Sequence, residues 1–215
     1  MTHPTNPVLS IPRRARTAGA PFPVPVELAQ NVSLGHYLPL IQRLTEMHHE
    51  RGRGIVAIFT AISPGQGVTF VVESLAWELA KQTGEQVLLT VPAGLSTGSL
   101  LSLPGADNAP SSVFRLSGAA DAPDASGDPL PEAMERLRNR FGFVLVDCPP
   151  MRKSTTALAL ARATDGIVLV TAAGEVRRGE IEYLRGVLNS TGTKVIGLVL
   201  NKREDPIPGF LSRLL

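Results

Sequence analysis

Five strongly apolar runs, each of the length of a β-strand, alternate with helix-like segments along this chain. The runs lie at residues 54–61, 86–91, 143–146, 166–171 and 194–200. A strand that is apolar at nearly every position is typical of a parallel sheet covered on both faces. The helix-like segments that separate or follow them lie at residues 68–82, 131–140, 155–163 and 178–189. Because strands and helices alternate, the sequence predicts right-handed crossovers and an α/β fold, with a mostly parallel sheet and helices on both faces.

The two ends of the chain differ in composition from the part that carries this alternation. Six prolines stand within the first 32 residues, where we expect a flexible arm without regular structure. Apolar side chains recur every three residues at 34–49, which predicts an amphipathic helix. Residues 92–128 are rich in small and polar types, so we expect long loops there around one short strand at 112–116. The predicted organisation is an arm at 1–32, one domain at 33–205 and a short apolar tail at 206–215.

Composition excludes several classes of protein. No run reaches 18 apolar residues, so we expect no membrane-spanning helix. Cys148 is the sole cysteine, which rules out an intramolecular disulfide and favours a cytoplasmic location; we expect this thiol to be a small buried filler. The formal net charge is only +2 and no basic run occurs, which argues against a nucleic-acid partner.

The loop after the first predicted strand has the composition of a phosphate-binding loop. It reads Ser63-Pro64-Gly65-Gln66-Gly67-Val68-Thr69, and a helix is predicted to begin at once. Glycines allow the backbone amides to turn inward and approach a phosphate, and the new helix adds its positive end. Thr69 stands where a hydroxyl would bind Mg²⁺. The alternative is a plain turn between strand and helix.

Two positions of this segment depart from the working pattern G-x-x-x-x-G-K-[ST]. Val68 stands at the lysine position, and Ile62 stands at the first glycine position. The lysine contributes positive charge at the β- and γ-phosphates, where charge develops during phosphoryl transfer. Valine supplies neither a charge nor a hydrogen-bond donor.

Four segments form one ordered set along the chain. They are Pro64–Thr69, similar to P-G-E-G-K-[ST]; Phe143–Val146 with Asp147-Cys148-Pro149-Pro150, similar to D-x-P-P; Ala163–Val170; and Val199–Lys202. Together they resemble the bacterial tyrosine kinases of capsule and exopolysaccharide assembly, which are relatives of the septum-positioning and plasmid-partition P-loop ATPases. The resemblance runs from about residue 34 to 201. It implies that residues 33–205 form a degenerate P-loop NTPase-like domain, a three-layer sandwich.

The resemblance also implies which residues form a vestigial nucleotide site. They are Pro64, Gly65, Gln66, Gly67, Val68, Thr69, Asp147 and Asn201. Asp147 corresponds to the family's Walker B carboxylate, Thr69 and Asp147 would hold any Mg²⁺, and Asn201 corresponds to an adenine contact. Asp147 has an alternative role, the capping of backbone amides in the segment that follows it.

Other family positions are lost. The second acidic motif, D-x-D, falls on Val91-Pro92-Ala93, and the aspartate expected after the Pro-Pro pair falls on Thr156. The family's C-terminal tyrosine cluster has no counterpart, because the two tyrosines, Tyr37 and Tyr183, lie in predicted helices.

These losses predict a catalytically impaired protein that acts as a scaffold or regulator. The resemblance implies a protein partner, either a membrane-embedded polysaccharide chain-length or export component or a related subunit, which would bring the chain to the inner face of the membrane. A homo-oligomer is a further alternative. The rival hypothesis is an active, ATP-dependent tyrosine kinase or ATPase with a substitute cation, from Lys153 or from an arginine of a neighbouring subunit. Arg177 and Arg178 are candidates for such an arginine, and the alternative for them is a solvated pair. Weak binding of ATP or ADP with Mg²⁺, the partner's identity and the role of residues 92–128 stay open.

Overall fold

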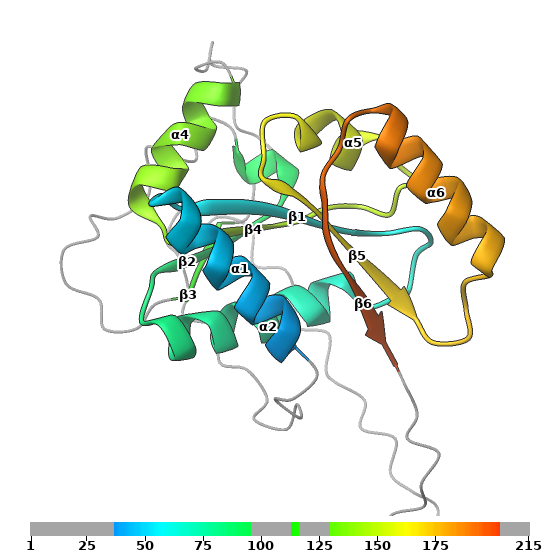
Figure 1. The fold of residues 1–215 in the computed structure, drawn as a ribbon, viewed down its shortest axis with the longest axis horizontal. Helices are drawn as coiled ribbons and strands as arrows, with labels where there is room; N and C mark the ends of the chain where they lie inside the picture. The colour runs from blue at the N-terminus through cyan, green and yellow to red at the C-terminus, as the bar shows by residue number, and fades with distance from the viewer. Residues whose placement is uncertain (1–36, 96–112, 117–129, 203–215) are drawn as a thin grey trace, which may run out of the picture.

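The strands of the protein form one sheet in which every pair is parallel (Figure 1). The computed structural model describes residues 37–95, 113–116 and 130–202. The strand order is β3-β2-β4-β1-β5-β6. The strands are β1 (Ile55–Ala61), β2 (Val87–Thr90), β3 (Val113–Leu116), β4 (Phe143–Asp147), β5 (Gly166–Ala172) and β6 (Val195–Asn201). The predicted α/β class is confirmed.

Helices cover both faces of this sheet, as predicted. They are α1 (Leu38–Arg51), α2 (Val68–Thr83), α4 (Leu130–Arg140), α5 (Thr156–Ala161) and α6 (Arg178–Ser190), with a short 3₁₀ turn, η2, at Pro92–Leu95. Helices α1 and α2 pack on one face, and α4, α5 and α6 pack on the other (Figure 1). The result is a three-layer α/β sandwich.

Strand β1 lies at the centre of the core. All seven of its residues are buried. Because side chains alternate along a strand, Ala57 and Phe59 face α1 and α2, whereas Val56 and Ile58 face α4 and α5. A strand buried in this way must be apolar at every position, which explains why the sequence signal was so clear.

Some predictions fall on residues that the structure does not describe. The arm at 1–32, the tail at 206–215 and most of the stretch 92–128 lie outside the described ranges, and these parts of the domain organisation stay predictions. The strand predicted at 112–116 is present as β3. Within the described ranges, no helix combines the length and the apolar character that a bilayer-spanning segment requires.

A buried carboxylate holds the end of the sheet opposite to the predicted phosphate loop. Asp165, whose side chain is 2% exposed, precedes β5 and accepts a hydrogen bond from the amide of Val56 at 2.8 Å. Three arginines surround it: Arg138 Nε lies at 3.3 Å, Arg53 at 3.4 Å, and Arg51 forms a further ion pair. Arg138 is itself buried and also donates to the carbonyl of Ala163. The cluster thereby ties α1, α4, β1 and β5 together.

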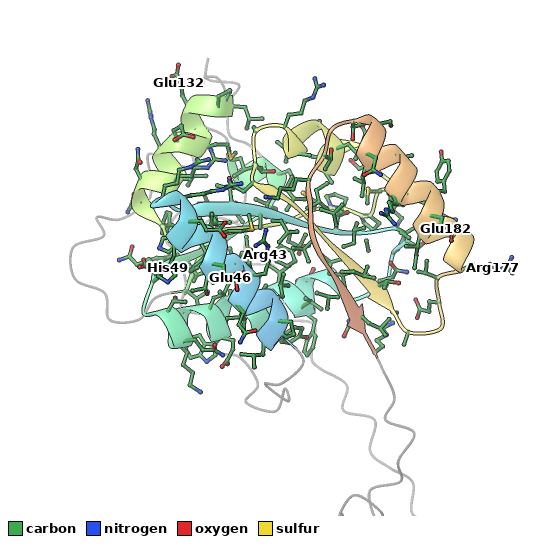
Figure 2. The ribbon with its side chains drawn as sticks, in the orientation of Figure 1. Arg43, Glu46, His49, Glu132, Arg177 and Glu182 are labelled. Carbon is green, nitrogen blue, oxygen red and sulfur yellow. The ribbon has the colours of Figure 1, made fainter. Side chains whose placement is uncertain are left out.

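We expect Asp165→Ala to lower the free energy of unfolding by about 3–5 kcal/mol, because it removes the buried counter-charge of Arg138 and leaves it only the exposed carboxylate of Glu135. Urea unfolding followed by circular dichroism measures this change. The matched control is Glu46→Ala, which removes an exposed ion pair with Arg43 on the outer side of α1 (Figure 2) and is expected to cost less than about 1 kcal/mol. If Asp165→Ala costs no more free energy of unfolding than Glu46→Ala does, the Asp165 cluster does not stabilise the fold.

Candidate functional site

The predicted phosphate loop joins β1 to α2 at the carboxyl end of the sheet. Gly65 and Gly67 both have φ of +84°, a left-handed conformation that favours glycine. Gly67 caps α2, and its carbonyl accepts the first helical hydrogen bond, from Val71 at 3.1 Å. In the described part of the chain, the amides of Gly67 and Val68 have no acceptor. The backbone therefore has the shape and the free donors that an anion requires.

The two predicted magnesium-binding side chains lie together beside this loop. Thr69 Oγ1 donates a hydrogen bond to Asp147 Oδ2 at 2.6 Å. The pairing of β1 with β4 sets Asp147 opposite Phe59, two residues before the end of β1. A hydroxyl and a carboxylate side by side fit a hydrated Mg²⁺, which prefers oxygen ligands.

The Asp147 carboxyl is the ionisable group of the site with a perturbed pKa. Burial raises its pKa above the ordinary value, the Thr69 hydrogen bond lowers it, the charge of Glu73 raises it and the charge of Arg115 lowers it. The net shift is upward, because burial is the largest cause. Ionised Asp147 is therefore destabilised until a cation approaches it.

The structure does not support the alternative role of Asp147 as a cap for the backbone amides that follow it. The amide of Met151 donates to the carbonyl of Ala61 at 2.8 Å, and that of Arg152 donates to Ile62 at 3.2 Å. Cys148 donates to Phe59 in the same way. These amides bind the strand and loop of β1, so Asp147 is not needed as their acceptor.

Val68 does not reach the phosphate side of the loop. Its side chain is 9% exposed and belongs to the core between α2 and the sheet. No cation therefore stands at the lysine position. The site fits the backbone contacts and the metal ligands of a nucleotide but lacks the positive charge that a working P-loop supplies.

Asn201 also lies at the loop. Its Nδ2 donates to the carbonyl of Gln66 at 2.9 Å, so the end of β6 holds the loop in place. A Cβ at position 67 would lie 2.2 Å from this Nδ2 atom, which leaves no room for a side chain there. Gln66 is 1% exposed, and its Oε1 has no hydrogen-bond partner in the described part of the chain. The predicted adenine contact of Asn201 stays a prediction.

Within the described residues, the side chains of Thr69 and Asp147 form no hydrogen bond or ion pair with Lys153, Arg177, Thr156 or Cys148. Lys153 is exposed in the turn after β4. Arg177 is exposed before α6, and its side chain extends away from the sheet (Figure 2). The hydroxyl of Thr156 shares a hydrogen bond with Ser154 at 2.6 Å. Cys148 is buried as expected, and burial raises the pKa of its thiol to about 12, so it is unreactive.

Sequence reasoning missed two charged residues of the site. Arg115 of β3 forms an ion pair with Glu73 of α2. Both line a pocket that Thr69 and Asp147 also line. The sequence does contain one indication, because Arg115 is a charged residue inside a short predicted strand. Its contact with Glu73 could not be predicted, because that contact depends on the order of strands in the sheet.

Comparison with known proteins identifies relatives of one kind. The chain matches no protein-family model. It is 29% identical over 190 residues to the tyrosine-protein kinase CpsD of Streptococcus agalactiae, which covers 73% of this chain and 78% of that protein. It is 27% identical over 170 residues to CpsD of Streptococcus pneumoniae serotype 4, covering 67% and 74%. These relatives are both named tyrosine-protein kinases, and the chain is similar to them over most of its length.

Solved structures of kinase domains and of a cell-division ATPase share the fold of this chain. The VpsO kinase domain superposes with a TM-score of 0.62 at 20% identity, covering 80% of this chain and 94% of that one. The BceF tyrosine kinase domain gives 0.60 at 24% identity, covering 78% and 76%. The cell-division ATPase MinD of Pyrococcus furiosus gives 0.53 at 20% identity, covering 74% and 78%. At these identities the likeness shows the fold alone.

We expect Gly67→Ala to lower the free energy of unfolding by about 1–3 kcal/mol, because it adds left-handed strain and displaces the Asn201 amide. Thermal and urea unfolding measure the change. The matched control is Gly65→Ala, which has the same φ but meets nothing within 4 Å, so it carries the strain alone. If the two variants lose equal stability, Asn201 does not constrain the loop.

We expect the Asp147 carboxyl to make stability fall as pH rises from its ordinary pKa of 3.8 through its raised pKa in the folded protein. In that window the folded state binds more protons than the unfolded state, so the free energy of unfolding decreases with pH. Asp147→Asn, which keeps an acceptor for Thr69, is therefore expected to be more stable than the natural chain at pH 7. Urea unfolding across pH 4–8 measures this, and a less stable variant at pH 7 would contradict it.

Proposed function

We propose that this chain is a catalytically impaired P-loop protein that serves as a scaffold or regulator in exopolysaccharide or capsule synthesis or export. The observation that carries the proposal is Val68, buried at the position of the P-loop lysine. Relatedness to proteins named tyrosine kinases supports a kinase-like role. The missing cation supports a role without efficient turnover.

A second loss supports the same conclusion. The segment Val91-Pro92-Ala93, which follows β2 and runs into η2, carries no carboxylate where the family has its second acidic motif. Removing one electrostatic stabiliser of a transition state costs about 10²–10³ in rate. Two such losses at one site leave turnover far below a useful rate, even when their effects are not additive.

The proposed partner is a protein. Membrane-embedded polysaccharide chain-length or export components and related subunits are the candidates, and docking to one of them would place the chain at the inner face of the cell membrane. A non-catalytic subunit acts by occupying a surface that its enzymatic relatives also use. The domain at 33–205 supplies this surface in the proposed organisation, with the arm at 1–32 and the tail at 206–215 outside it.

The second candidate function is an active ATP-dependent tyrosine kinase or ATPase with a substitute cation. The specific observation that favours it is the intact pair of Thr69 and Asp147, joined at 2.6 Å beside the loop. In P-loop NTPases a hydroxyl and a carboxylate of this kind hold the Mg²⁺ ion that bridges the β- and γ-phosphates.

Turnover distinguishes the two functions. We expect no Mg²⁺-dependent ATP hydrolysis or tyrosine phosphorylation above background, measured as phosphate release and by ³²P transfer to a tyrosine copolymer. Asp147→Asn is the matched control, and sustained hydrolysis that this variant abolishes would overturn the scaffold proposal. Val68→Lys is expected to tighten ATP binding without restoring turnover, because the carboxylates of the second acidic motif are still missing.

A further inference from the structure

Neither Lys153 nor Arg177 is among the charged groups that act on the Asp147 carboxylate. Lys153 is exposed in the turn after β4, and Arg177 points away from the sheet (Figure 2). In the described part of the chain, the charged groups whose fields act on the Asp147 carboxylate are Glu73 and Arg115. Arg115 is therefore the positively charged residue that acts on this carboxylate.

The sheet register explains why Arg115 reaches this place. β3 pairs with β2, and Arg115 lies beside Leu89. Leu89 belongs to the core under α1 and α2, and so does Val113, two residues before Arg115. Because neighbouring positions across a parallel pair, and alternate positions along a strand, face the same way, Arg115 points to the α2 side of the sheet.

Helix α2 brings Glu73 to the same place. Glu73 lies one helical turn after Thr69, so both residues lie on one side of α2. Arg115 forms an ion pair with Glu73, and both side chains line a pocket together with Thr69 and Asp147. The walls between them are apolar and include Val72 and Leu89.

The Glu73–Arg115 pair can be broken by a competing anion. Its side chains are 25% and 38% exposed, and pairs with this exposure contribute little to stability. A guanidinium can bind a phosphate through two parallel hydrogen bonds, whereas Arg115 makes a single contact with Glu73. The phosphate chain of a nucleotide also carries more negative charge than one carboxylate, so it competes well for Arg115.

We propose that Arg115 is the anion-binding cation of this site and substitutes for the P-loop lysine when a polyphosphate, the phosphate chain of a nucleoside triphosphate, binds with Mg²⁺. Glu73 holds Arg115 in the free protein and competes with the ligand for it. The backbone amides of the loop and the Thr69–Asp147 pair bind the same phosphate chain. This inference rests on the P-loop of the proposed function but not on its lack of turnover.

Calorimetric titration of the full chain with MgATP, MgADP and AMP tests the proposal. We expect the natural chain to bind MgATP, and Arg115→Gln to weaken that binding about ten- to hundredfold, the loss of a charge-assisted contact, while AMP is little affected. Arg115→Lys is expected to fall between them, since it keeps the charge but not the planar fork. Glu73→Gln is expected to tighten MgATP, because it removes the competing carboxylate.

The matched control is Arg43→Gln, which breaks another ion pair of an arginine, with Glu46 on α1, away from the pocket. It is expected to leave MgATP affinity unchanged, and thermal unfolding checks that each variant is folded. The proposal is overturned if the natural chain does not bind MgATP, or if Arg115→Gln binds it as tightly as the natural chain does. ATP hydrolysis measured in the same samples distinguishes the scaffold function from the role of Arg115. Turnover would contradict the scaffold function, but it would not change what the binding data say about Arg115.

Discussion

The parallel pairing of β1 with β4 is the interaction on which the candidate site depends. It sets Phe59 beside Asp147, and two hydrogen bonds continue the contact beyond the strands, from Cys148 to Phe59 and from Met151 to Ala61, both at 2.8 Å. The phosphate loop thus begins next to the carboxylate. At the other end of β1, the buried Asp165 cluster accepts the amide of Val56. A strand held at both ends positions the loop without help from a ligand.

The interior of the fold was predictable because burial leaves a local signal. A central parallel strand is apolar at every position, so β1, β4 and β5 were found within a residue or two of their observed bounds. Thr69 and Asp147 were assigned to one magnesium site from the family resemblance rather than from the strand pattern, and a 2.6 Å hydrogen bond joins them in the structure. Helix α5, with six residues, is shorter than its predicted span because nothing in the local pattern marks its ends.

The rest of the site was not predictable, because it depends on contacts between distant segments. Arg115 reaches the pocket only because β3 lies next to β2, and sheet order has no signature in an edge strand of four residues. Asn201 was assigned from the family resemblance alone, and its hydrogen bond to Gln66 depends on the position of β6 across the sheet. The arginines around Asp165 come from α1, α4 and the loop before β1, 27 to 114 residues away in the sequence.

The shape of the loop and the charges beside it carry different information about ligand binding. The conformation of the loop is maintained by two glycines, by the Asn201 hydrogen bond and by the amides after β4. None of these contacts requires a bound phosphate. A correct loop shape therefore says little about binding. Asp147 is different, because burial raises its pKa and its ionised form destabilises the folded chain in the absence of a cation. The fold does not require such a group at the end of β4, so this carboxylate and Arg115 near it are the features that favour a retained ligand.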